Sequence, residues 1–300
     1  MKVLLFGSNG QVGWELQRSL SILGDVVALH RASRDHCGDL STLEGLAETV
    51  KEVRPDVIVN AAAYTAVDKA ESEPELAARI NGAAPGVLAL EAQRLGAWLV
   101  HYSTDYVFDG SGGRPWTETD LPAPLSVYGR SKLEGERAIA ANCERYLILR
   151  TSWVYAARGG NFIRTMLRLA QERERLTVID DQHGAPTSAD LVADVTAHAV
   201  RQLTTRGAEG KSLAGIYHLA AAGETSWHGY AGHLLSCAPQ VQPNFRPKAT
   251  EIAPVKSEAV VTAARRPLNS RLDTAKLQAV FGLIMPPWQQ GVDRVLAEIL

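Results

Sequence analysis

The N-terminal segment reads as a β-strand, a glycine-containing turn and a helix, and this order limits the possible folds more than any other part of the chain. We expect the strand over Val3–Phe6 and an amphipathic helix over Trp14–Leu23, with glycines at positions 7, 10 and 13 between them. Glycines in such a turn let the backbone approach a pyrophosphate, which the helix N-terminus then binds. The spacing is wider than that of the common G-x-G-x-x-G fingerprint. Its place between a strand and a helix favours a dinucleotide site over three glycines that only end a strand.

Short β-branched runs alternate with helical patterns through the first half of the chain. Strands are expected over 57–60, 98–103 and 146–150, and a helix begins near Pro74. Ser41 and Glu44 form a capping-box pattern ahead of a further helix that runs to Val53. This alternation requires right-handed βαβ crossovers and therefore a parallel sheet. The sequence predicts an α/β protein with a doubly wound parallel sheet of the Rossmann type and a second, smaller domain.

The predicted NAD(P)-binding domain spans residues 1–155. Residues 189–225 return to it through a helix after Ala189 and a strand over 216–219. The smaller, substrate-binding domain takes residues 156–188 and 226–300, so the chain crosses between the two lobes more than once. Composition changes after Cys237, where four prolines predict an irregular, loop-rich region: Pro239, Pro243, Pro247 and Pro254.

Composition fits a compact enzyme. The 300 residues, 46% of them hydrophobic, can bury a large core and fill two domains. The formal net charge of −2 gives no electrostatic case for nucleic acid. Three scattered cysteines argue against a disulfide framework or a C-x-x-C site, so we expect reduced thiols at Cys37, Cys143 and Cys237. No apolar run approaches the ~20 residues that a membrane span needs, and no cleavable signal is recognisable, so we expect a cytoplasmic protein without a membrane partner.

Tyr128 and Lys132 stand four residues apart in the segment VYGRSK, so on a helix they share one face. A positive charge beside a tyrosine favours the phenolate and lowers the pKa of the hydroxyl, which can then exchange a proton with an alcohol or a ketone. A packed aromatic ring under a solvated lysine gives the same spacing. The dinucleotide pattern at the N-terminus favours the catalytic interpretation.

The segment after the second strand bears on the choice of cofactor. An acidic residue that would select NADH by binding the ribose 2′-hydroxyl is missing there, and the sequence reads His30-Arg31-Ala32-Ser33-Arg34. Arg31 and Arg34 could neutralise a 2′-phosphate, although solvated loop arginines are the alternative. We expect NADPH to be used at least as well as NADH.

Taken together, these residues resemble the extended short-chain dehydrogenases/reductases, and more narrowly the dTDP-4-dehydrorhamnose reductase family. The similarity spans nearly the whole chain. Its matching blocks are Gly7–Gly13, Asp39–Leu40, Asn60–Asp68, Ser103–Phe108, Tyr128–Lys132, Arg150–Tyr155, Asp181–Thr187, Arg265–Pro267 and Asn269–Ser270.

The resemblance implies cofactor-binding and catalytic roles for particular residues. Thr104 would hydrogen-bond the substrate carbonyl beside Tyr128, and Lys132 would bind the nicotinamide ribose. Asn81 matches a position used in a water-linked proton relay, a surface residue being the alternative. The implied cofactor-binding residues are Gly7, Gly10, Gln11, Val12, Gly13, His30, Arg31, Asp39, Leu40, Ala61, Ala62, Ala63, Tyr64, Thr65, Tyr128 and Lys132.

The resemblance also implies the substrate and the reaction. NAD(P)H would reduce the C4 ketone of dTDP-4-dehydro-β-L-rhamnose to dTDP-L-rhamnose, the last step in making this precursor of cell-surface polysaccharides such as the O-antigen, with Tyr128 as proton donor. Thr104, Asp105 and Trp153 would surround the sugar. Arg265 and Arg266 are candidates for the diphosphate, although consecutive loop arginines are usually solvated.

Two other functions use many of the same features. A nucleotide-sugar 4,6-dehydratase or 4-epimerase shares the fold and the Tyr/Lys pair, but dehydration needs a second carboxylate after the threonine, and Tyr106 follows Asp105 here. A non-catalytic NADP-binding regulatory subunit, like the relative that accompanies methionine adenosyltransferase, needs no proton donor, so the full set of Thr104, Tyr128 and Lys132 argues against it.

Some members of the family are described as binding Mg²⁺ at a dimer contact through acidic residues. Glu15 and Asp190 match two such positions, but Val292 stands near the third. Because Mg²⁺ needs several oxygen ligands, a metal site is doubtful, and a monomer or a metal-independent homodimer fits the sequence equally well.

Overall fold

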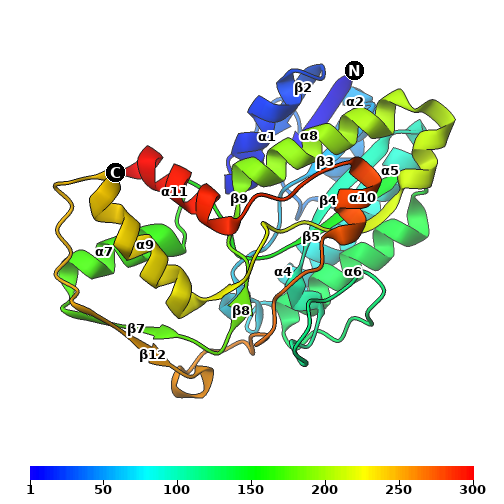
Figure 1. Ribbon diagram of the computed structural model, residues 1–300. Coiled ribbons are helices and arrows are strands. Elements are labelled where there is room, and N and C mark those ends of the chain that lie inside the picture. The colour runs from blue at the N-terminus through cyan, green and yellow to red at the C-terminus, as the bar shows by residue number, and fades with distance from the viewer.

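The computed structural model describes residues 1–300, except for the side chain of Ala208, and consists of a large α/β lobe and a smaller lobe beside it (Figure 1). Within the part described, no helix has the length and apolar character that a membrane crossing requires. The large lobe contains a parallel sheet of six strands. They are β1 (Lys2–Phe6), β2 (Asp25–Leu29), β3 (Val57–Asn60), β4 (Trp98–Thr104), β5 (Tyr146–Thr151) and β10 (Gly215–His218).

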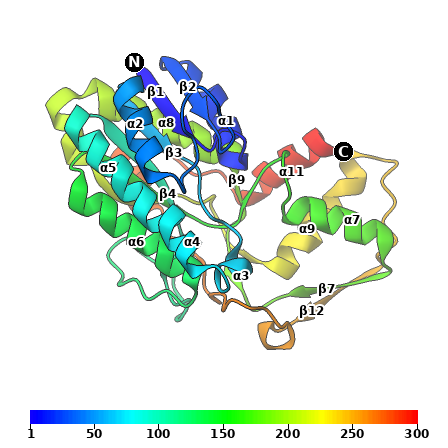
Figure 2. The same cartoon turned by 180° about the vertical axis from the view of Figure 1, so that it is seen from behind.

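Helices cover both faces of this sheet, as a doubly wound fold requires. Alternate strand residues point to opposite faces, so Leu5 and Val59 join one core while Leu4 and Ile58 join the other. The first core is closed by α1 (Gln11–Ser21), α8 (Ala189–Thr205) and α10 (Ala275–Phe281). The second, facing the viewer in Figure 2, is closed by α2 (Leu43–Val53), α5 (Ala84–Leu95) and α6 (Val127–Asn142). The predicted fold class is confirmed.

The strand order is β10-β5-β4-β3-β1-β2, so the direction of winding reverses between β1 and β3. Open α/β sheets bind ligands outside the carboxyl ends of their strands at such a switch point. The turn after β1 and the segment after β3 meet there, because a Cβ built on Gly7 would lie 2.7 Å from the Ala62 nitrogen. Between β3 and α5 lie α3 (Val67–Ala70), α4 (Pro74–Ala78) and a π-helical turn (Arg79–Ala83).

The smaller lobe is built mainly from α7 (Phe162–Glu172), α9 (Trp227–Val241) and α11 (Trp288–Ile299), which bury a separate apolar core. The strand β7 (Arg175–Ile179) pairs in parallel with β12 (Glu251–Val255) at the edge of this lobe (Figure 1). Short strand pairs join the lobes: β6 (Val154–Tyr155) with β9 (Thr187–Ser188), and β8 (His183–Gly184) with β11 (Thr225–Ser226).

Residues 189–225, which were expected to return to the large lobe, contribute a helix and a strand to it. Helix α8 packs on α1, and β10 pairs with β5 from Gly215 to His218. Near the C-terminus, α10 also packs on the large sheet, since Leu277, Phe281 and Met285 lie in its core. The division into domains at 155, 188 and 225 stays a prediction.

Two local predictions were wrong. The capping box does not form, because α2 begins at Leu43 after Thr42, and the Ser41 hydroxyl donates to the Asp39 carboxylate at 2.8 Å instead. The region after Cys237 is more regular than its prolines suggested. Pro239 lies in the last turn of α9, where few main-chain bonds are lost, and Pro254 lies in β12, which pairs on one side only.

Candidate active site

One cavity of about 950 Å³ lies at the carboxyl edge of the large sheet and extends to the smaller lobe. The segments that follow β1, β2, β3, β4 and β5 all contribute residues to its wall. The topology of the sheet therefore brings distant parts of the sequence together here. The predicted site residues on its wall are Gly7, Gly10, Gln11, Val12, Arg31, Asp39, Leu40, Ala61, Ala62, Ala63, Tyr64, Thr65, Thr104, Asp105, Tyr128, Lys132 and Trp153.

The glycine turn lies at one end of this cavity, and it has formed as the sequence predicted. Gly7 has φ +85°, a conformation that side chains rarely adopt. Its carbonyl accepts from the Gly10 N–H at 2.9 Å, and a Cβ built on Gly13 would lie 2.0 Å from that same oxygen. Gly13 is buried under the turn and does not line the cavity, so its role is to let helix and strand approach. The α1 N-terminus at Gln11 faces the cavity, where its free N–H groups suit a diphosphate.

The far end of the cavity is lined by Arg31, Gly38, Asp39 and Leu40. The Arg31 Nε donates to the Asp39 carboxylate at 3.2 Å, and the Arg31 side chain is 78% exposed. His30 and Arg34, which the sequence also placed at the cofactor, do not line the cavity. The guanidinium of Arg31 is therefore the cation available at this end for a ribose phosphate.

Tyr128 and Lys132 lie on α6 as predicted, with Thr104 across from them at the end of β4. The expectation that Lys132 lowers the pKa of Tyr128 was wrong for this structure. Burial raises the pKa of Tyr128 to about 12, an interaction with the Thr104 hydroxyl opposes the rise, and the charge of Asp105 adds to it. The phenol is therefore held protonated at neutral pH, which suits a proton donor.

Lys132 lies on the cavity wall with its side chain buried, and its Nζ contacts groups of β4. Its Nζ donates to the Tyr102 carbonyl at 2.6 Å and lies 3.2 Å from Nε2 of His101. Burial lowers the pKa of Lys132 to about 8, while the nearby Glu136 carboxylate opposes this shift. A lysine with this pKa exchanges protons near neutral pH.

Three features fix the position of α6 and of the face that carries Tyr128 and Lys132. Ser126 caps the helix by accepting from the Gly129 N–H at 3.2 Å. Gly129 allows close packing, because a Cβ built there would lie 2.2 Å from the Tyr106 carbonyl oxygen. One turn beyond Lys132, Glu136 accepts from Nε of Arg150 at 2.9 Å and from Nη2 at 2.6 Å, with both side chains buried.

Asn81 is buried in the π-helical turn that precedes α5, so the surface alternative is wrong. Its amide accepts from the Tyr64 N–H at 2.8 Å and donates to the Ser131 hydroxyl at 3.0 Å. Asn81 thus ties the cavity-lining segment after β3 to α6. Its part in a proton relay stays a prediction.

The wall between the lobes carries Asp105 and Trp153. Oδ1 of Asp105 accepts from the Thr104 hydroxyl at 3.1 Å, but Oδ2 is buried without a hydrogen-bond partner. Ser103, Thr151 and Ser152 also line the cavity, and each has a hydroxyl oxygen that is buried behind the wall without a hydrogen-bond partner. The polar residues on this wall suit a ligand that carries hydroxyl groups.

Trp227 lines the cavity too, and the sequence did not point to it. It begins α9 in the smaller lobe, where its ring stacks on Trp153 with centroids 3.8 Å apart and an angle of 16° between the planes. The stack holds Trp153, whose φ of +48° is unusual for a bulky residue. Because residues 153 and 227 are distant in sequence, no local pattern reveals this pair.

Ionisation of the buried Asp105 carboxyl should make the stability of the protein depend on pH. Burial raises its pKa from 3.8 to about 6, against hydrogen bonds that lower it, so the folded protein carries a penalty for ionising this carboxyl. Asp105→Asn removes the penalty and is expected to raise the free energy of unfolding at pH 8 by about 3 kcal/mol, falling to about half of that at pH 5. Urea unfolding at both pH values measures the difference. The exposed Asp35→Asn is the control and should give no pH-dependent gain; an equal gain there would contradict the assignment.

Arg265 and Arg266, predicted to contact the diphosphate, do not line the cavity. Arg265 is exposed, and Arg266 is bound to Asp68, with Nη2 donating to the carboxylate at 2.6 Å. The side chain of Arg266 is also close enough to Tyr106 to affect its pKa. Its contact with substrate stays a prediction.

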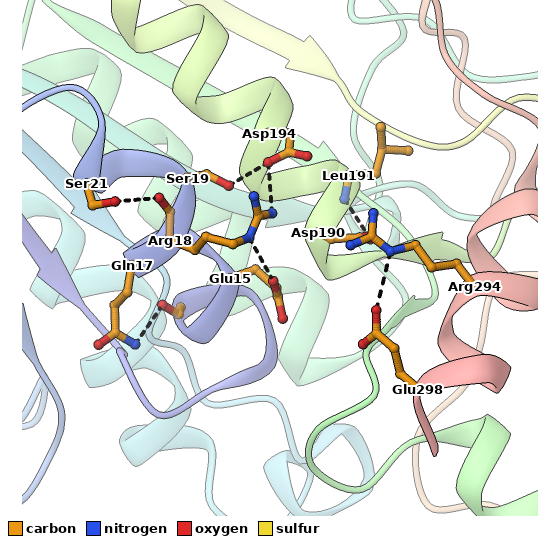
Figure 3. Close-up of polar contacts among 11 residues, drawn as sticks. Glu15, Gln17, Arg18, Ser19, Ser21, Asp190, Leu191, Asp194, Arg294 and Glu298 are labelled. Atoms are coloured by element: carbon orange, nitrogen blue, oxygen red, sulfur yellow. Dashed lines mark hydrogen bonds and ion pairs between the residues drawn. The ribbon is translucent and has the colours of Figure 1, made fainter. Parts of the chain in front are cut away.

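The acidic residues considered for Mg²⁺ are paired with arginines (Figure 3). Arg294 contacts Asp190 at 3.2 Å and Glu298 at 3.3 Å, and Arg18 contacts Glu15 at 3.7 Å. Val292, near the third position, is fully buried in the smaller lobe. Guanidinium groups occupy the positions beside the carboxylates, so this donor set does not fit a Mg²⁺ site within one chain.

Among the described residues, His233, Cys237 and Asp293 bring possible ligand atoms within 4.8 Å of one another. Nε2 of His233 is 2.8 Å from the Asp293 carboxylate, as in an ordinary hydrogen bond. Sγ of Cys237 lies 3.7 Å from Nε2 and 4.0 Å from Nδ1, so it sits beside the ring and not on the line of either lone pair. The group therefore lacks the arrangement of a metal centre.

All three cysteines are free thiols, and of these only Cys143 is buried.

A switch-point cavity with a glycine turn at one end and a Thr/Tyr/Lys set at the other defines an NAD(P)-dependent oxidoreductase of the extended short-chain dehydrogenase/reductase class. Comparison with known proteins narrows this class. The family model described as "RmlD substrate binding domain" matches residues 1–300, and the chain belongs to this family. It is 55% identical over 299 residues to the dTDP-4-dehydrorhamnose reductase of Shigella flexneri, covering 100% of this chain and 98% of that protein. The enzyme of the same name from Burkholderia thailandensis is 49% identical, with 100% and 99% covered.

Solved structures agree with the family. A dTDP-4-dehydrorhamnose reductase from Bacillus anthracis in complex with NADP is 34% identical, with a TM-score of 0.88 and 99% of both chains covered. The reductase from Clostridium acetobutylicum is 33% identical, with the same TM-score and 98% of both chains covered. A UDP-glucose 4-epimerase from Thermus thermophilus in complex with NAD, 20% identical with a TM-score of 0.78, shows the shared fold alone.

Proposed function

We propose that this protein is an NAD(P)H-dependent dTDP-4-dehydrorhamnose reductase, which reduces the C4 ketone of dTDP-4-dehydro-β-L-rhamnose to dTDP-L-rhamnose. The observation that carries the proposal is the Tyr128 phenol, one helical turn from Lys132 and across from Thr104, in the cavity that begins at the glycine turn. Full-length similarity to reductases of this name supports the substrate. The proposed product is a precursor of cell-surface polysaccharides.

The glycine turn fits a dinucleotide, because a side chain at Gly7 or Gly13 would overlap neighbouring backbone and so distort the turn. Residues of the turn would hold the diphosphate, Asp39 and Leu40 the adenine, and Lys132 the nicotinamide ribose. The bound cofactor supplies the hydride. Arg31 supports the use of NADPH, because it is the arginine after β2 that lines the cavity, where a guanidinium could bind the 2′-phosphate.

The chain's own residues would position the ketone and supply the proton. Thr104 and Tyr128 would donate to the carbonyl oxygen, so that negative charge developing there is stabilised as Tyr128 gives up its proton. Asp105 would accept from a sugar hydroxyl, and Trp153 would offer its ring to the apolar face of the hexose. Binding of the remote nucleotide would help to orient the sugar.

The test is an assay of the purified protein with dTDP-4-keto-6-deoxyhexoses and each reduced cofactor. We expect one equivalent of cofactor to be oxidised for each ketone reduced, and a kcat/KM with NADPH at least equal to that with NADH. A protein that retains oxidised cofactor and interconverts two sugar nucleotides would be an epimerase. Cofactor binding without turnover of any ketosugar nucleotide would indicate a regulatory subunit.

A further inference from the structure

A short segment of the smaller lobe, residues 156–161, reaches across to the large lobe beside the glycine turn. It links β6 to α7, and both of its ends are fixed in the smaller lobe. Tyr155, just before it, is buried in the core of that lobe. Phe162, just after it, packs on the rings of Trp227 and Tyr230, with centroids 4.7 and 4.9 Å away. We call this segment the strap.

Two contacts fasten the strap to α1, which lies in the large lobe (Figure 1). The guanidinium carbon of Arg158 lies 3.8 Å from the centre of the Trp14 ring, a cation–π contact. Nδ2 of Asn161 donates to Oε1 of Gln11 at 3.0 Å, and within the strap it also donates to the Ala156 carbonyl at 2.7 Å. Both partners in the large lobe belong to the first turn of α1, the helix end that is proposed to bind the diphosphate.

Between its two fastened residues the strap borders the cavity. Gly159 lines the cavity together with Gly10 and Gln11. Its φ of +79° is a left-handed conformation that favours glycine, and a Cβ built on it would lie 3.4 Å from Cγ of Gln11. The strap therefore presents main chain, and no side chain, at the end of the cavity where the diphosphate is proposed to bind.

We propose that the strap is the smaller lobe's part of the cofactor site: it lies over the dinucleotide at its diphosphate and slows the release of the bound cofactor. Arg158 and Asn161 do not line the cavity, so they are positioning residues that act through Trp14 and Gln11. Release requires the strap to move away from α1, and both contacts break when it does. This inference rests on the dinucleotide site of the proposed function and needs no particular sugar.

The two contacts are weak enough to open during turnover. Arg158 and Trp14 are both exposed, where a cation–π contact changes a rate about threefold, and a single neutral hydrogen bond has a similar effect. Because the contacts use different partners on α1, their effects on release should multiply to about tenfold.

The test measures how fast the full-length protein releases NADPH, by stopped-flow fluorescence after its complex is mixed with excess NADP⁺. Arg158→Met keeps the apolar stem and removes the guanidinium. Asn161→Ser keeps a capping oxygen for α7 but is too short to reach Gln11. We expect release about threefold faster in each variant and about tenfold faster in the double variant. Lys276→Met is the control, because it removes a cation 4.4 Å from the Tyr217 ring, away from the cavity, and should leave the rate unchanged.

Trp14→Leu separates the contact from the charge of Arg158. It removes the ring and leaves the guanidinium, so it should accelerate release as much as Arg158→Met does. Combining these two substitutions should add nothing further, because both remove the same contact. An unchanged rate in Trp14→Leu would mean that Arg158 acts through its charge alone, and it would overturn the proposal.

Hydrogen exchange gives a second readout that needs no activity. NADP⁺ should protect the amides of residues 156–161 in the unmodified protein, and protect them less in the Arg158→Met/Asn161→Ser variant. Release rates that none of these variants changes, or an equal acceleration in Lys276→Met, would overturn the strap and leave the reductase assignment standing. Faster release in a protein that turns over no ketosugar nucleotide would support the strap and contradict the proposed function.

Discussion

Replacing Tyr128 with phenylalanine is expected to lower kcat about 10²–10⁴-fold, the usual contribution of a general acid. The substitution removes the hydroxyl proposed to donate the proton and keeps the ring, which packs edge-on against Tyr106 with centroids 5.5 Å apart. Steady-state oxidation of the reduced cofactor measures the loss. Affinity for the cofactor, measured by the quenching of protein fluorescence, should fall far less than kcat, because Tyr128 is only one of the residues proposed to contact the cofactor and the glycine turn and Lys132 are untouched.

Tyr106→Phe is the matched control, since Tyr106 lines the same cavity and is half-buried like Tyr128. We expect it to lower kcat less than tenfold, well below the range for a general acid. A Tyr128→Phe enzyme as fast as the unmodified protein would remove the proposed proton donor. A loss in Tyr106→Phe as large as that in Tyr128→Phe would show that packing, and not proton transfer, limits the rate.

Replacing Glu136 with glutamine is expected to lower the free energy of unfolding by about 3–5 kcal/mol, because it leaves the Arg150 guanidinium buried without a balancing charge. Both side chains are at most 3% exposed. The guanidinium already has an unpartnered Nη1 and lies 5.1 Å from the centre of the Phe108 ring. Equilibrium unfolding in urea measures the loss.

The surface pair on α7 provides the control. Arg168 contacts Glu172 at 2.8 Å with both side chains more than half exposed, so Glu172→Gln should cost less than about 0.5 kcal/mol. Replacing both Glu136 and Arg150 with methionine should recover much of the stability, because a buried ion pair and an apolar pair of similar volume are often equivalent. A Glu136→Gln protein as stable as the unmodified one would contradict the importance of this pair.

Much of the fold could be predicted because it depends on local patterns. The run Val3–Phe6, the glycines after it and the alternation of later strands and helices reflect backbone preferences that act over a few residues. The Tyr128 and Lys132 pair was visible for the same reason, since four residues make about one helical turn. The capping box at Ser41 failed because its hydroxyl had a competing partner in Asp39, a choice that the pattern alone does not reveal.

The hydrogen-bond partners and the burial of the site residues could not be predicted from local sequence patterns. Sequence spacing suggested that Lys132 acts on the Tyr128 hydroxyl, but the folded chain directs the ammonium at the Tyr102 carbonyl and at His101. Burial then sets both pKa values, raising that of the tyrosine and lowering that of the lysine. Burial is a property of the whole packed lobe, so no motif carries it.

By itself, the sequence determined a parallel sheet of the doubly wound type, the glycine turn after its first strand, and the position of Tyr128 and Lys132 on one face of a helix, because neighbouring residues encode each of these. Only the tertiary structure decided that Trp227 stacks on Trp153, that Arg150 neutralises Glu136, and that arginines bind the acids Glu15 and Asp190. These contacts, apart from that of Arg18 with Glu15, join residues far apart in the chain. Their energies depend on distance, direction and exclusion of water, which exist only once the chain has folded.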